Sequence, residues 1–166
     1  SNTTVTTEVT YGDVLSVLPP PRALWTTDHG NEIEVSLVKD NGDVNSITRE
    51  EILNGENRAL IYNRNTGIGE IIQFQNAAIA DNGATVVLST LTRGVRGTEY
   101  AMDKHGLGET FLLLNEEDLQ VGTFDFEVLG NKTYFKAVSA GQLINSADTT
   151  TRQIKGRALM PYAPSR

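Results

Sequence analysis

The stretch Glu32-Ile33-Glu34-Val35-Ser36-Leu37 decides the fold class of this chain. Polar and apolar residues alternate strictly along it. Because successive side chains of a β-strand point to opposite faces, this period of two predicts a strand with one buried face and one wet face. Helix signals elsewhere are few and too short to connect parallel strands. The sequence therefore predicts an all-β fold, mainly an antiparallel sandwich or barrel-like sheet, with a few short helical turns.

Two hairpins are expected. One joins residues 70–78 to residues 84–91 through Asp81-Asn82-Gly83. The other joins the alternating run Phe124, Phe126 and Val128 to residues 133–138 through Gly130-Asn131. Glycine and asparagine tolerate the positive φ of a tight primed turn, which favours a turn at both places.

Three short helical turns are expected. Thr48-Arg49-Glu50-Glu51 matches a capping box, in which the threonine hydroxyl and the glutamate carboxylate satisfy each other's backbone amides. Ile52 and Leu53 would then point inward, and Asn54-Gly55 offers a stop. The other two turns are expected over residues 98–104 and directly after Asn115.

The ends of the chain differ from its middle. Residues 1–18 are rich in Thr and Val and are expected to form either a strand or an arm, and Pro19-Pro20-Pro21 is stiff and extended. We therefore predict an N-terminal arm or linker at 1–21, a β-rich domain at 22–160, and an exit linker at 161–166.

Composition narrows the class of function. Of 166 residues, 39% are hydrophobic and 21% are charged, and the net charge is −7. An acidic chain has no general attraction to nucleic acid or to anionic membranes. Without cysteine there is no disulfide, thiolate zinc site or thiol nucleophile. No apolar run is long enough for a membrane-spanning segment, and the N-terminus lacks the features of a signal peptide.

No motif of known chemistry stands out. The two histidines, His29 and His105, lie far apart without metal-ligand spacing, so hydrogen-bonded loop positions are favoured over a ligand or a base. Asp40-Asn41-Gly42-Asp43 lacks the spacing and closing Glu of a calcium loop. Gly67-Ile68-Gly69 lacks the third glycine of a dinucleotide site. The sequence predicts no catalytic residue, no cofactor and no metal.

One segment is unusual: Leu91-Thr92-Arg93-Gly94-Val95-Arg96-Gly97-Thr98-Glu99. Two arginines and two glycines directly follow a predicted strand. The arginines could bind an anionic ligand, or they could reach back to internal carboxylates and carbonyls and hold a long loop in place. We favour the second interpretation. The predicted structural loop motif consists of Arg93, Gly94, Arg96, Gly97, Thr98, Glu99 and His105.

At this segment the chain resembles the tail hub proteins of long-tailed phages and gene transfer agents, also called host-specificity or tail-tip proteins. The motif continues as His105-Gly106-Leu107-Gly108 and an apolar strand, Phe111-Leu112-Leu113-Leu114. Further matches, in the family's order, are Gly12-Asp13-Val14-Leu15, the Asp28-led strand, Leu53-Asn54-Gly55-Glu56-Asn57, Gly69-Glu70-Ile71-Ile72-Gln73-Phe74 and Tyr162-Ala163-Pro164. The residues around 62–68 and Val95 depart from the family pattern.

The resemblance implies a non-enzymatic structural component of a tail-tip or baseplate hub, located at the virion tail tip and active in tail assembly and host attachment or penetration. Its implied partners are other hub domains and tail-tip proteins, a homotrimer in the assembled tail, and a host surface receptor. Strand edges are expected to pair with neighbours. Two rivals stay open. A carbohydrate- or receptor-binding module would expose Trp25, Tyr62, Tyr100 or Tyr162 on a concave face. A cell-wall hydrolase is favoured least.

Overall fold

The computed structural model describes residues 8–24, 26–40, 42–80, 85–115 and 124–159. The chain divides into two compact units, residues 1–120 with 162–166, and residues 121–161. The predicted all-β class is confirmed, because the strands pair antiparallel and the helices are short. Among the described residues, no helix has the length and apolar character needed to cross a membrane.

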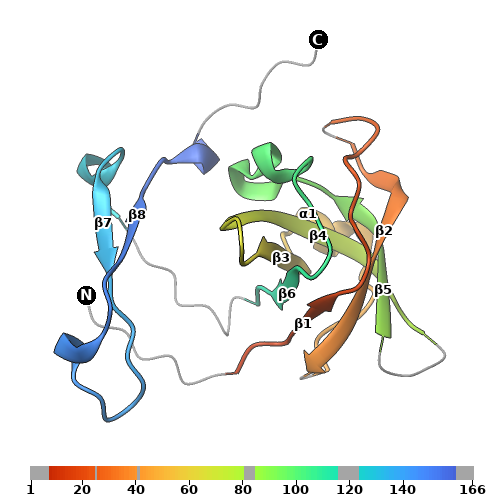
Figure 1. Cartoon of the computed structure of the whole chain (residues 1–166). Coiled ribbons are helices and arrows are strands. Elements are labelled where there is room, and N and C mark those ends of the chain that lie inside the picture. The colour runs from red at the N-terminus through yellow and green to blue at the C-terminus, as the bar shows by residue number, and fades with distance from the viewer. Residues whose placement is uncertain (1–7, 25, 41, 81–84, 116–123, 160–166) are drawn as a thin grey trace. The chain divides into compact units, whose positions relative to one another are not determined.

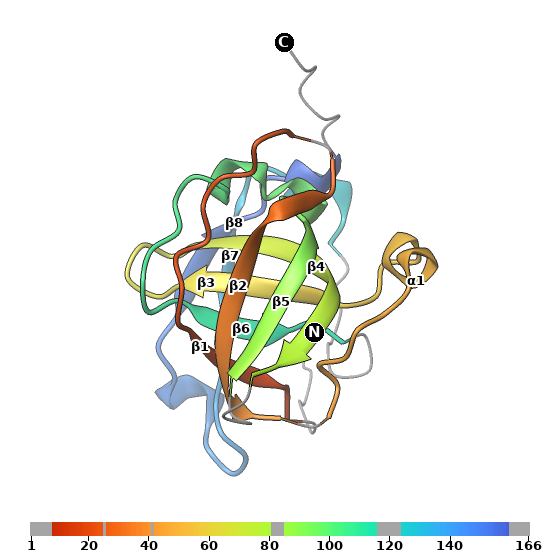
Figure 2. The ribbon, with the colours of Figure 1, turned by 90° about the vertical axis from the view of Figure 1, so that its right-hand side faces the viewer.

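Six strands of the first unit close into an antiparallel barrel in the order β1-β2-β5-β4-β3-β6 (Figure 1). They are β1 Tyr11–Val14, β2 Asp28–Lys39, β3 Arg58–Asn63, β4 Ile68–Ile79, β5 Thr85–Thr92 and β6 Thr110–Leu113. Figure 2 shows the neighbouring strands β2, β5 and β4 along one side of the barrel. Closure gives each of these strands two neighbours, so the expectation of open edges is wrong for the barrel.

The alternating stretch that opened the analysis lies in β2 and behaves as predicted. Ile33 and Val35 are fully buried, and Glu32 and Glu34 between them are exposed. The expected pairing of residues 70–78 with 84–91 is confirmed as β4 against β5, and the Ala80 amide donates to the Thr85 carbonyl at 2.8 Å. The predicted turn at Asp81-Asn82-Gly83 lies outside the described residues.

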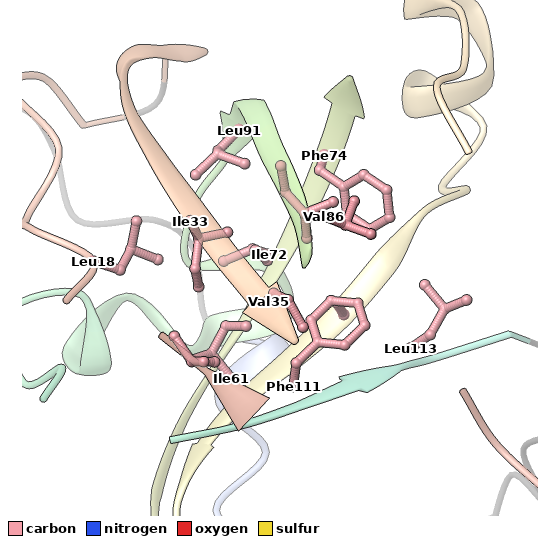
Figure 3. Packing of buried hydrophobic residues seen from close by; sticks show 13 residues of the cluster. Leu18, Ile33, Val35, Ile61, Ile72, Phe74, Val86, Leu91, Phe111 and Leu113 are labelled. Carbon is pink, nitrogen blue, oxygen red and sulfur yellow. The ribbon is translucent and has the colours of Figure 1, made fainter. Parts of the chain in front are cut away.

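The inward faces of the strands form one apolar core. In Figure 3 the side chains point toward one another from opposite strands, and the rings of Phe74 and Phe111 lie 6.4 Å apart. Burying one Val, Leu, Ile or Phe side chain contributes about 1.5–3 kcal/mol, so this cluster is the main stabilising feature of the barrel. The core consists of Val14, Leu18, Ile33, Val35, Ala59, Ile61, Ile72, Phe74, Val86, Leu88, Leu91, Phe111 and Leu113.

The N-terminal segment belongs to the barrel, which differs from the expected arm at 1–21. Strand β1 pairs with both β2 and β6 and thereby closes the sheet, while Val14 and Leu18 are buried in the core. The strand alternative for residues 1–18 thus holds for Tyr11–Val14. The expected single domain at 22–160 also differs from the structure, in which the two units divide between residues 120 and 121.

The capping box is confirmed at helix α1, Arg49–Leu53. The Glu51 amide donates to Thr48 Oγ1 at 3.3 Å, and the Thr48 amide donates to Glu51 Oε2 at 2.7 Å. The helix stops at Asn54, followed by Gly55 with φ of 92°. The inward position expected for Leu53 is wrong, because this side chain is 76% exposed.

Short 3-10 turns supply the remaining helical structure of the first unit. Val95–Gly97 forms η1, and Glu99–Ala101 forms η2 within the turn expected at residues 98–104. The turn expected after Asn115 begins outside the described residues.

The second unit contains strands β7 Lys132–Phe135 and β8 Thr150–Gln153, with 3-10 turns η3 Phe126–Val128, η4 Ile144–Ser146 and η5 Arg157–Leu159. The predicted hairpin across Gly130-Asn131 is wrong: β7 pairs with β8, and the Gly130 amide donates to the Ile154 carbonyl. The alternating run before it forms a turn, because the described residues of this unit provide no core to bury one of its faces, and Phe126 is 81% exposed.

Candidate functional site: a buried ion network

Two acidic residues continue the inward face of the barrel beyond its apolar core. Glu70 precedes Ile72 and Phe74 with the period of two of β4, and it is fully buried. Glu109 stands two residues before Phe111 of β6 and is 2% exposed. Because side chains alternate along a strand, both carboxylates point into the barrel. They lie at the same end of it, where the apolar core stops and the loops begin.

A bulge directs Arg93 toward these carboxylates. The pairing of β2 with β5 shifts between Asp28 and Glu32, and Thr90 has a positive φ of 57°. Leu88 and Leu91 are consequently both buried although they are three residues apart. With the phase of the strand reset in this way, Arg93 follows Leu91 into the interior.

The Arg93 guanidinium forms a bidentate ion pair with the Glu70 carboxylate. Nε donates to Oε1 and Nη2 donates to Oε2, both at 2.8 Å. The third nitrogen, Nη1, donates to Asp28 Oδ2 at 3.2 Å and to the Pro19 carbonyl at 2.9 Å. One side chain thus ties the segment after β1 to the start of β2 and to β4. Bidentate hydrogen bonds between charged groups are stronger than hydrogen bonds between neutral groups.

His105 bridges the two glutamates. Its Nδ1 lies 2.7 Å from Glu109 Oε2, and its Nε2 lies 2.6 Å from Glu70 Oε2. A carboxylate can only accept, so both contacts are hydrogen bonds when the ring is an imidazolium with two N–H donors. The two cations then face three carboxylates, and all five side chains are only 0–4% exposed. We call Asp28, Glu70, Arg93, His105 and Glu109 the barrel-end network.

Hydrogen bonds and opposite charges shift the pKa values of Glu70 and His105. Burial by itself raises the pKa of Glu70, but hydrogen bonds from His105 and Arg93, the charge of Arg93 and the Gly94 amide outweigh burial and hold that pKa below its ordinary value. Burial by itself lowers the pKa of His105, but hydrogen bonds to Glu70 and Glu109 and the charges of both glutamates outweigh it and raise that pKa. Each group stabilises the charged form of its partner.

The loop after β5 is held by backbone and hydroxyl groups as well. Gly94 has φ of 64° and donates its amide to Glu70 Oε1 at 2.8 Å, and a Cβ there would collide with Met102 Cε. The Thr98 hydroxyl donates to the Val95 carbonyl at 2.7 Å and accepts from the Ile71 amide at 3.0 Å. The loop is therefore fastened to β4 at two points.

The predicted loop motif divides into two groups. The structure brings Arg93, Gly94, Thr98 and His105 together around β4. Gly97 supplies a turn with φ of 81°, and Glu99 starts η2. Arg96 differs: it is exposed, has φ of 60°, and makes no hydrogen bond or ion pair within the described part of the chain. The predicted role of holding the loop in place through internal acceptors therefore applies to Arg93 but not to Arg96.

Sequence reasoning missed three members of the network: Asp28, Glu70 and Glu109. A usable signal existed for the glutamates, since each stands in phase with an inward apolar run. An acid at a core position of a strand needs a buried cation, because an unpaired buried charge is very unfavourable. The partner, Arg93, was visible, but the bulge that turns it inward was not.

The network has its charges paired within the chain. Asp28 also accepts from the Gly30 and Asn31 amides, both at 3.2 Å, and the Asn63 amide group approaches Glu109 at 3.4 Å. No group of three or more His, Cys, Asp or Glu suited to a metal ion occurs among the described residues. The second histidine, His29, is exposed and takes no part in the network. Because these donors and acceptors bond to one another, the network connects the segments that meet at this end of the barrel.

Comparison with known proteins identifies the family to which the chain belongs. A family model described as Rcc01698-like, C-terminal, matches residues 9–112, which is more than half of the chain. The match runs from just before β1 into β6 and so covers the network. The comparisons with curated proteins and with solved structures found no match. The chain belongs to the Rcc01698-like, C-terminal family.

Proposed function

We propose that this chain is a β domain of a phage or gene-transfer-agent tail-tip hub, with a structural role in tail assembly and host attachment or penetration. Family membership alone assigns no activity, so the proposal rests on the resemblance of the motifs. The observation that carries it is the internal use of the Arg-Gly loop: Arg93, Gly94, Thr98 and His105 contact other parts of the same barrel. Residues used in this way favour a rigid building block over a reactive centre.

An antibody against the chain tests the location. Gold-labelled antibody is applied to tail particles from cultures of the source bacterium, with an antibody against the tube protein as the control. We expect the gold at one end of each tail, while the control labels the whole tube. Label along the whole tube, or particles without label, would contradict the proposal. A peptidoglycan turnover assay on the purified chain checks the hydrolase rival, and turnover above a heat-denatured sample would favour it.

A binding module is the second candidate, favoured by grooves beside residues 20–27. One groove of about 350 Å³ is lined by apolar and polar side chains that include Leu53, Gln75 and Thr92. A second, of about 410 Å³, is lined by Tyr100, which is 42% exposed. Of the other aromatic candidates, Tyr62 is half-buried in β3, and Trp25 and Tyr162 lie outside the described residues. A glycan array with reproducible hits that Tyr100→Ala abolishes would favour this function.

A further inference from the structure

The first of the two grooves lies on the outer side of β4 and β5, between helix α1 and the segment at residues 21–27. Gln73 and Gln75 of β4 and Thr92 of β5 line its floor, and Gln73 is paired with Thr92 across the two strands. These side chains face outward because they alternate with core residues of the same strands. The floor of the groove therefore consists of amide and hydroxyl groups.

The walls of the groove are largely apolar. Arg49, Ile52 and Leu53 share one face of α1, because residues three and four positions apart lie on the same side of a helix. Gln73 Nε2 donates to the Ile52 carbonyl at 2.8 Å, which fixes α1 beside β4 (Figure 2). Leu24, which is 52% exposed, belongs to the other wall. The exposed position of Leu53 is thus a position in this groove.

The segment that forms the other wall is anchored to the barrel. The Pro19 carbonyl accepts from Arg93 Nη1 at 2.9 Å and from Asn31 Nδ2 at 3.4 Å. Asn31 Nδ2 also approaches the Pro20 carbonyl at 3.4 Å. Both donors belong to barrel segments, since Asn31 lies in β2 and Arg93 follows β5. A groove that is formed in advance loses less free energy when a ligand binds.

The groove is a cationic site on an acidic protein. The chain contains 21 acidic residues and has a net charge of −7, yet none of these acids is among the described residues that line the groove. Of its two arginines, Arg93 is already paired with Glu70 and Asp28. Arg49 is exposed and makes no hydrogen bond or ion pair within the described ranges. Complementary charge therefore favours an anionic ligand.

The polar floor favours one kind of anion. The side chains of Gln75 and Thr92 make no hydrogen bond to any described residue, and an amide and a hydroxyl can each donate and accept. The N–H and C=O groups of a peptide match both roles. A hydrocarbon chain would displace water from these groups without replacing its hydrogen bonds, which is unfavourable. The volume of about 350 Å³ is in the range of small-ligand sites.

We propose that this groove binds an extended segment of a partner protein in which an acidic residue stands beside an apolar one. The carboxylate pairs with Arg49, the apolar side chain packs against Leu24 and Leu53, and the peptide groups bond to Gln75 and Thr92. Both β4 and β5 already have two neighbours in the barrel, so side chains carry the recognition. The inference goes beyond the proposed structural role and does not rest on it.

An array of synthetic decapeptides of random sequence tests the proposal, with the full chain detected through an affinity tag. We expect bound peptides to be enriched in Asp or Glu next to Leu, Ile or Val. Arg49→Glu should remove the acidic preference, and Leu53→Ser should remove the apolar one. The matched controls make the same changes on exposed residues that do not line the groove, and they should bind like wild type. These controls are Arg64→Glu and Leu107→Ser, where Leu107 is 74% exposed and Leu53 is 76% exposed.

Fluorescence polarisation with the best-bound peptide measures the size of the effect, and circular dichroism verifies that each variant is folded. Arg49→Glu should weaken binding about tenfold or more. An array without acidic enrichment would overturn the proposal, and so would the same enrichment for Arg49→Glu as for Arg64→Glu. Binding of decanoate in place of any peptide would overturn it in favour of a lipid-like anion.

The chain's own acidic segment is the other occupant to exclude. Residues 116–118 are Glu, Glu and Asp, they precede Leu119, and they lie outside the described residues. Glu117→Lys should bind the peptide no more tightly than Glu127→Lys, which controls for the change in net charge. Tighter binding by Glu117→Lys would mean that this segment competes for the groove, and a partner protein would be the wrong occupant. None of these outcomes affects the antibody result at the tail end, so the two proposals are tested separately.

Discussion

Replacing Arg93 tests whether the barrel-end network holds the fold together. Arg93→Ala removes both bonds to Glu70 and those to Asp28 and the Pro19 carbonyl. Removing one partner of a buried ion pair costs about 3–5 kcal/mol. We expect the lower end, about 3 kcal/mol, because Glu70 keeps its bonds to His105 and to the Gly94 amide.

Thermal and urea unfolding followed by circular dichroism measure the effect. For a barrel of roughly 110 residues, 1 kcal/mol corresponds to about 4 °C in Tm, so Arg93→Ala should lower Tm by about 12 °C. Arg96→Ala is the matched control, since this exposed side chain has no partner among the described residues, and its effect should stay within about 0.5 kcal/mol. Arg93→Lys keeps the charge without the fork and should fall between wild type and Arg93→Ala.

Two outcomes would refute this reasoning. Equal losses for Arg93→Ala and Arg96→Ala would mean that the loop is held by something other than the network. An unchanged Tm for Arg93→Ala would mean that Glu70 is stabilised without its main cation. A double-mutant cycle with Glu70→Ala supplies an independent measure, and a coupling energy below about 0.5 kcal/mol would contradict direct contact.

Three further predictions concern the same end of the barrel and helix α1. Stability should peak at intermediate pH: the contribution of His105, whose folded pKa is raised, is complete below its ordinary 6.5 and is lost as pH rises through the raised pKa. The contribution of Glu70, whose folded pKa is lowered, is complete above 4.5 and is lost as pH falls through the lowered pKa. Urea midpoints from acid to alkaline pH check this, and a His105→Gln variant that keeps the alkaline decline would contradict it. Gly94→Ala should destabilise more than Gly108→Ala in thermal melts, because both have positive φ but only Gly94 is crowded, and equal losses would exclude crowding. Thr48→Ala should cost about 1 kcal/mol in urea unfolding through loss of the helix cap, and no loss would mean the capping box is dispensable.

Local patterns in the sequence predicted the local structure well. The alternation at Ile33 and Val35 and the capping box at Thr48 each depend on residues a few positions apart, and both are confirmed. The alternation at Phe124 and Phe126 had the same appearance but forms no strand. A period of two produces a strand only where a sheet neighbour and a core receive it, and neither can be seen in a short segment.

The network depended on longer-range information. Arg93 and Glu70 are 23 residues apart, and Arg93 and Asp28 are 65 residues apart. Their meeting requires the pairing of β5 with both β2 and β4 and the bulge opposite Thr90, and the composition of the chain indicates neither. Glu70 could have been suspected from its phase with Ile72, but its partner could not have been identified.

The position of the charges suggests why a barrel keeps them inside. A slip of one residue in β4 would turn Glu70 outward, because side chains alternate between the two faces. It would also bring Ile71, Gln73 and Gln75 inward in place of Ile72 and Phe74, so the slip is unfavourable for the apolar core as well as for the ions. Arg93 and His105 would then be buried without their shared carboxylate, at the high cost of an unpaired charge. The network and the apolar core therefore both favour the same register of β4. A fixed barrel in turn presents its outer faces in one arrangement, as the proposed structural role would require.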